Sequence, residues 1–131
     1  MLATPEVPDS VASIAELTRA FGGRVWLVSK CGERTQERTL RWLQAHDFYN
    51  RTGIDPGHVR FCRKQAEKRG HCEELGLTHF VDDRLGVHAA IHGVVDHQYV
   101  FGPQTEPVPE YAVHVLTWPQ ALAHIEATLA R

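Results

Sequence analysis

The sequence of 131 residues lacks any long hydrophobic run, and this absence limits the kinds of protein it can encode. Its longest apolar stretch covers only residues 25–28. A helix that crosses a bilayer needs about 20 apolar residues, so no membrane-spanning helix is predicted. The first residues also lack the charged-then-apolar pattern of a secretory signal.

Positive charge is not in excess either, because 14 Lys and Arg residues face 16 Asp and Glu residues and the net charge is −2. General nucleic-acid-binding proteins are usually strongly basic. Proteins that dock on anionic membranes carry clustered positive charge. We therefore expect neither a nucleic-acid partner nor a membrane partner.

The sequence has only three cysteines, which is an odd number. They lie far apart along the chain and are Cys31, Cys62 and Cys72. This pattern does not form a disulfide framework, and it favours a reducing, cytoplasmic environment. The nine histidines do not join the cysteines at the paired spacing of a structural zinc site. A cysteine phosphatase needs an arginine six residues after its cysteine, but Glu37 stands at that position after Cys31. No nucleophilic cysteine is therefore predicted.

The amino-acid composition, with 43% hydrophobic and 23% charged residues, is typical of one globular domain. Helical periodicity and short β-branched runs alternate along the chain. We expect helices at residues 10–21, 34–46, 67–75, 85–91 and 118–129, and strands at 24–28, 58–62, 78–81, 94–101 and 112–116. The regular alternation predicts a single three-layer α/β domain over residues 1–131 with a mostly parallel sheet.

Local signals refine some of these elements. Asp9 or Ser10 can cap the first helix, because a short side-chain oxygen accepts from an unpaired N–H. Leu40 and Leu43 are expected to face inward from the second helix. Thr117, with Gln120 three residues later, has the form of a capping box for the last helix.

Other polar and aromatic residues are assigned to the surface or the core. His88 and His92 lie four apart on one helix and are expected at the surface. The stripe of Arg34, Arg38 and Arg41 is expected to be a solvated face that pairs with nearby glutamates. The tryptophans are expected in the core, at positions 26, 42 and 118.

Ser29 follows the first apolar strand, and Lys30 continues from it toward a helix. A hydroxyl together with free amides at a helix N-terminus suits a phosphate or a carboxylate. The alternative is a capping serine without a ligand.

Asp82 and Asp83 follow a buried strand, and two adjacent carboxylates repel each other unless a cation or hydrogen-bond donors compensate. Magnesium prefers one or two carboxylates with waters and phosphate oxygens. The alternative is a capping Asp paired with Arg84. Lys68 opens the preceding helix, where it can neutralise an anion at the same sheet edge or remain solvated.

Taken in order, these motifs resemble the haloacid dehalogenase-like (HAD) superfamily of phosphohydrolases. VWLVS at residues 25–29 looks like its second motif, Lys68 like its third, and FVDD at residues 80–83 like its fourth. LATPEVP at residues 2–8 also looks like the segment that follows the first motif in small bacterial members. The resemblance covers most of residues 2–104.

The resemblance implies a Rossmann-like fold and magnesium-dependent hydrolysis of a small phosphorylated molecule. It makes Ser29 a hydrogen-bond donor to the phosphoryl group, with Lys30 beside it in substrate binding. It makes Lys68 the charge neutraliser, and Asp82 with Asp83 the magnesium ligands. Substrate identity in this superfamily usually comes from inserted cap segments, and residues 48–57 are too short for a large one.

One departure from the family concerns its first motif, a strand ending in Asp-x-Asp that supplies the nucleophile and the acid/base. No such segment occurs, because only Glu6 and Asp9 are acidic near the start and no apolar strand precedes them. We expect that the chain is part of a longer protein, with ~25–35 residues of strand and connection before it. The alternative is a catalytically inactive HAD-like binding or interaction module.

Loss of the first-motif strand, which is central in the family, would leave sheet edges with unpaired backbone groups. Such edges favour self-association, so a homo-oligomer is also expected. A third alternative is a flavodoxin-like or receiver-like domain. A receiver would need a phospho-acceptor Asp at another strand end, which the sequence does not show.

Overall fold

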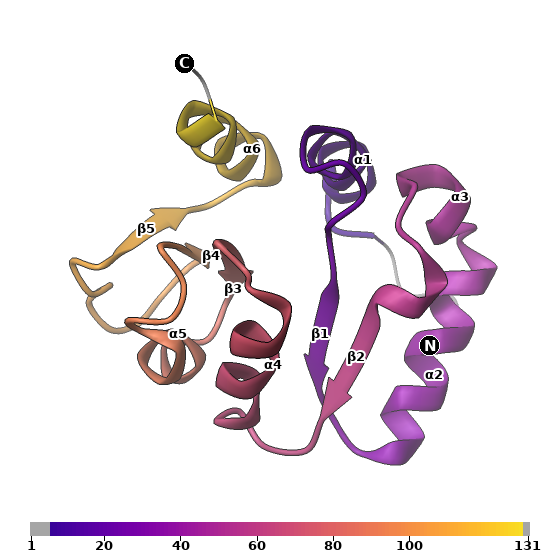
Figure 1. Ribbon diagram of the computed structural model, residues 1–131, viewed down its shortest axis with the longest axis horizontal. Helices are drawn as coiled ribbons and strands as arrows, with labels where there is room; N and C mark the ends of the chain where they lie inside the picture. The colour runs from indigo at the N-terminus through magenta and orange to yellow at the C-terminus, as the bar shows by residue number, and fades with distance from the viewer. Residues whose placement is uncertain (1–5, 130–131) are drawn as a thin grey trace. The chain divides into compact units, whose positions relative to one another are not determined.

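The computed structural model describes residues 6–129 and shows a mixed α/β protein, with six α-helices and two small parallel sheets in those residues (Figure 1). Every strand pairing there is parallel, which confirms the predicted α/β class. The chain divides into two compact units, Met1–Arg63 and Lys64–Arg131. The expectation of a single domain stays a prediction. None of the helices in residues 6–129 has the length and apolar character needed to cross a membrane.

The first unit contains a two-stranded sheet and three α-helices. Its elements are α1 (Ser10–Ala20), β1 (Leu27–Lys30), α2 (Glu33–Ala45), α3 (Phe48–Thr52), a 3-10 turn η1 (Pro56–His58) and β2 (Val59–Cys62). Leu27 of β1 lies opposite Val59 of β2 in the parallel register. A buried cluster from the helices and the following loop packs against these two strands; its members are Val11, Leu43, Phe48 and Ile54.

Two predictions about helices in this unit are wrong. Leu40 is 38% exposed rather than inward, because α2 turns Trp42 and Leu43 toward the core. Asp9 occupies the capping position of α1, but it has left-handed backbone angles and its side chain makes no capping hydrogen bond. Ser10 is the first residue of the helix itself. Two glycines with positive φ, Gly22 and Gly23, follow the end of α1.

The first strand and the segment after α2 also differ from the prediction. β1 begins at Leu27 and continues through Ser29 and Lys30, so these residues lie within the strand rather than after it. Residues 48–52 form the short helix α3 where the sequence predicted only a connection. Five residues are too few for a stable isolated helix, so burial of Phe48 must stabilise α3.

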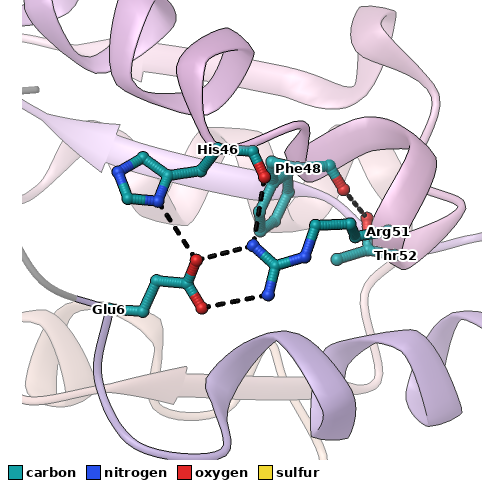
Figure 2. A network of polar contacts seen from close by, with 5 residues as sticks. All are labelled: Glu6, His46, Phe48, Arg51 and Thr52. Carbon is teal, nitrogen blue, oxygen red and sulfur yellow. Dashed lines mark hydrogen bonds and ion pairs between the residues drawn. The ribbon is translucent and has the colours of Figure 1, made fainter.

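A polar network attaches the segment before α1 to α3 and to the turn that precedes it (Figure 2). Arg51 donates to both carboxylate oxygens of Glu6, at 2.6 and 3.2 Å, and also to the main-chain oxygen of His46. The Nδ1 atom of His46 lies 3.1 Å from the Glu6 carboxylate. Of the segment likened to the one that follows the family's first motif, residues 2–5 lie outside the described part of the chain.

The second unit contains a three-stranded sheet in the order β3-β4-β5. Its elements are α4 (Glu67–Leu75), β3 (His79–Asp82), α5 (Leu85–Ile91), β4 (His97–Phe101), β5 (Ala112–Val115) and α6 (Trp118–Leu129). The predicted helices match within a residue. The predicted strands also occur, although β4 is shorter than its segment.

The two faces of this sheet are covered by different helices. Phe80 and Gln98 lie level in the parallel register, so they share a face, and Gln98 hydrogen-bonds to α5. His79 points to the other face, where it bonds to Thr128 of α6 at 2.7 Å. Because side chains alternate along a strand, Asp82 at the end of β3 lies on the α5 side.

Candidate functional site

The second unit holds a buried ion pair at the carboxyl end of β3. Nζ of Lys68 donates to Oδ2 of Asp82 at 2.8 Å, and the two side chains are only 7% and 9% exposed. Lys68 lies in the first turn of α4, fourteen residues before Asp82. The Lys68 ammonium also lies 6.0 Å from the centre of the Phe80 ring. A buried charge is costly unless it is paired, so each residue depends on the other.

The other carboxylate oxygen of Asp82 is also engaged. Oδ1 accepts from the backbone N–H of Arg84 at 2.9 Å. This bond, from a carboxylate to the N–H two residues later, stabilises the turn that leads from β3 into α5. Asp82 is not the capping residue foreseen as an alternative, because Arg84 itself occupies the capping position of α5 and no side chain makes a capping hydrogen bond there.

Asp83 lies at the same edge but is exposed. Its main-chain oxygen accepts from Nε2 of Gln104 at 2.9 Å, which connects the loop after β4 to the end of β3. The two adjacent carboxylates thus have different surroundings. Asp82 is compensated by Lys68 and the Arg84 N–H, whereas Asp83 faces solvent.

Magnesium was expected at Asp82 and Asp83, and the hydrogen bonds of the Asp82 carboxylate limit how it could bind a metal ion. Both Asp82 oxygens already accept hydrogen bonds, one of them from a cation. Within residues 6–129, no group of three or more His, Cys, Asp or Glu side chains could hold a metal ion. Because magnesium can bind to only one or two carboxylates, its binding at Asp82 and Asp83 stays a prediction.

Ser29 and Lys30 belong to the first unit. Ser29 is half-buried in β1 and lies opposite Phe61 of β2, and Lys30 at the end of the strand is exposed. The backbone continues from β1 to Cys31, whose N–H donates to the oxygen of Cys62 at 2.9 Å. That Ser29 and Lys30 act together with Lys68 and Asp82 stays a prediction.

Cys31, Cys62 and Cys72 are thiols rather than members of disulfide bonds. Cys72 lies one helical turn after Lys68 and is buried. Burial raises the pKa of the Cys72 thiol to about 11, although the positive charge of Lys68 opposes this increase. Cys72 is therefore a protonated core residue at neutral pH.

The prediction that His88 lies at the surface is wrong. Its side chain is fully buried between α5 and the sheet, where it contacts Gln98 and the main chain of Asp82. His92, four residues later, is exposed as predicted, and its ring stacks on Tyr111. The four-residue spacing between His88 and His92 does not by itself show whether a histidine faces the core or the solvent. A further signal is Val87, the fully buried residue just before His88.

Comparisons with known proteins do not assign this chain to a family. No protein-family model matches the chain, and a search of curated proteins finds no match. The resemblance to HAD-like hydrolases therefore depends on the short motifs and their order along the chain.

Proposed function

We propose that this chain carries the phosphoryl-neutralising part of a HAD-like hydrolase that acts on phosphomonoesters. The observation that supports this is the Lys68–Asp82 pair. The resemblance assigns these residues to one site, and they lie 2.8 Å apart at the carboxyl end of a parallel strand. Ligands of open parallel sheets bind at that end.

The chemistry of Lys68 suits this role. An ammonium group has three N–H donors, and the structure places one of them on Asp82. Lys68 lies in the first turn of α4, where the helix dipole is also positive. In the transition state of phosphoryl transfer, negative charge is spread over the phosphoryl oxygens. Positioned cations therefore supply much of the stabilisation of that transition state.

The proposal places the nucleophile outside these residues. In the family an aspartate attacks the phosphorus atom, and water then hydrolyses the aspartyl phosphate. This sequence has no counterpart of that aspartate. We therefore expect this chain to bind phosphate but to hydrolyse phosphomonoesters very slowly or not at all.

A titration with inorganic phosphate tests the proposal. In the wild type we expect phosphate to raise the melting temperature and to shift the NMR signal of the Lys68 ammonium. Lys68→Met should lose the rise in melting temperature, whereas Lys64→Met changes an exposed lysine of the same unit and should keep both effects.

Two results of this titration would contradict the proposal. One is a wild type that does not respond to phosphate. The other is a response that survives in Lys68→Met, because phosphate would then bind elsewhere.

The surroundings of Asp82 favour a second candidate, a non-enzymatic binding module in which the pair is structural. Both Asp82 oxygens are engaged, and both side chains of the pair are more than nine-tenths buried. Removal of one partner from a buried pair costs about 3–5 kcal/mol, but replacement of both by apolar groups is often nearly neutral.

Urea unfolding of three variants tests the structural role. Lys68→Met alone should lower the free energy of unfolding by about 3–5 kcal/mol, because Asp82 is left buried and unpaired. Lys68→Met combined with Asp82→Leu should recover most of that loss, while Lys64→Met should change little. A double variant that recovers stability and a wild type that ignores phosphate would together favour the binding module. If the single variant is as stable as the wild type, the pair has no structural role.

A further inference from the structure

The fully buried His88 connects the end of β3 to the middle strand of the sheet. Its Nε2 lies 2.9 Å from the main-chain oxygen of Asp82, and its Nδ1 lies 3.0 Å from Nε2 of Gln98. Gln98 is also buried, and its Nε2 bonds to the main-chain oxygen of His88 at 2.9 Å. The imidazole thus contacts polar groups through both nitrogens.

These contacts determine which nitrogen of His88 carries the proton. A backbone oxygen only accepts, so the Gln98 atom beside the oxygen of His88 must be the amide nitrogen. That nitrogen then donates to Nδ1, which must be unprotonated. Nε2 therefore carries the proton and donates to the oxygen of Asp82. The bonds fit a neutral imidazole in a single tautomer.

The bond from His88 acts on the residue that pairs with Lys68. Its acceptor is the carbonyl group between Asp82 and Asp83, so it orients that peptide group. The carboxylate of Asp82 is attached to the same residue and bonds to Lys68 and to the Arg84 N–H. The peptide group that His88 orients therefore begins at the residue whose carboxylate pairs with Lys68.

We propose that His88 and Gln98 form a positioning pair that holds the carboxylate of Asp82 on Lys68. This inference deepens the proposed function, because it identifies what fixes the geometry of the Lys68–Asp82 site. Gln98 sets the tautomer of His88, and His88 fixes the peptide group after Asp82. If His88 only filled space, neither its tautomer nor the N–H donor at its Nε2 would affect the Lys68–Asp82 pair.

NMR of the imidazole nitrogens and of the Lys68 ammonium tests the proposal in the whole chain. In the wild type we expect His88 to carry its proton on Nε2 and the Lys68 ammonium to exchange its hydrogens slowly. His88→Met removes the donor and should speed that exchange roughly tenfold or more, as loss of one buried hydrogen bond predicts. His88→Gln can still donate to Asp82 and should restore most of the protection.

Two further variants complete the experiment. Gln98→Met keeps the imidazole but removes the group that sets its tautomer, so the His88 signals should show a mixture of tautomers and Lys68 should exchange faster. This variant also serves if His88→Met fails to fold. His124→Met changes an exposed histidine of α6 and should leave the Lys68 signal unchanged.

The positioning role would be overturned by either of two results. One is a wild-type His88 with its proton on Nδ1. The other is a folded His88→Met or Gln98→Met variant in which Lys68 exchange is unchanged. Neither readout uses phosphate, so the role can stand if the wild type fails to bind phosphate, and it can fail while phosphate still binds.

Discussion

Glu6 and Lys68 are both charged residues held by an opposite charge, but their surroundings differ. Lys68 is almost fully buried with Asp82, whereas the Glu6 side chain is 26% exposed and its partner Arg51 more so. Salt screens exposed charges strongly and buried ones weakly. The Glu6 network should therefore weaken as salt is added, and the Lys68–Asp82 pair should not.

The Glu6 network predicts a dependence of stability on pH. Hydrogen bonds from Arg51 and then from His46 lower the pKa of Glu6 below its ordinary value of 4.5. A carboxyl with a lowered folded-state pKa stabilises the fold above its unfolded-state pKa. The stabilisation by Glu6 should thus be complete above about pH 4.5 and be lost as the pH falls through the folded-state pKa.

Melting temperatures measured across pH test this expectation. Glu6→Gln should melt below the wild type at neutral pH, and the difference should shrink in acid. Glu16→Gln removes an exposed carboxylate from α1 and should show no such trend. A difference that stays constant down to strong acid would mean that the charge of Glu6 does not stabilise the protein.

At the scale of elements, helices with local start and stop signals differ from those that depend on packing. α4 ends at Gly76, whose φ of 63° most other residues disfavour, and the sequence predicts this end. α3 has no such clear signals, because Asp47 and Gly53 bound only five residues. It forms where Phe48 and Ile54 enter the core of the first unit.

α6 illustrates a helix start that can be tested. Oγ1 of Thr117 accepts from the N–H of Gln120 at 3.2 Å, as the capping box predicts. The side chain of Gln120 accepts from the N–H of Leu116, one residue before the usual position. Thr117→Ala should lower the free energy of unfolding by about 1 kcal/mol. Urea unfolding measures this loss.

Two control variants make that measurement specific. Thr117→Ser keeps a hydroxyl that can cap and should keep most of the stability. Thr105→Ala changes an exposed threonine in the loop before β5 and should cost little. Equal losses in Thr117→Ala and Thr105→Ala would show that the cap contributes nothing measurable.

At the scale of the whole molecule, the mass of the native product tests the expectation of a missing first-motif strand. The chain described here has a mass of 14.8 kDa. If a first-motif strand with a short connection precedes these residues in the protein made from its own chromosomal locus, it adds roughly 3–4 kDa. Mass spectrometry of that protein distinguishes the candidates, because a mass near 14.8 kDa favours the non-enzymatic module. A heavier product should be assayed next as a phosphatase.

The amino-acid sequence by itself determined the alternation of helices and strands, and most of their positions. It did so because helical periodicity, β-branched runs and glycines act over a few neighbouring residues. It also identified Lys68 and Asp82 as candidates for one site, because a lysine that opens the helix before a strand can reach the carboxyl end of that strand.

Only the tertiary structure decided which polar residues are buried together. His88 and Gln98 are ten residues apart and carry no motif, and their pairing follows from the packing of α5 on β4. Contacts between Glu6 and Arg51 likewise join residues that are 45 positions apart. Burial and partnership depend on such long-range packing, so local patterns could not reveal the roles of these residues.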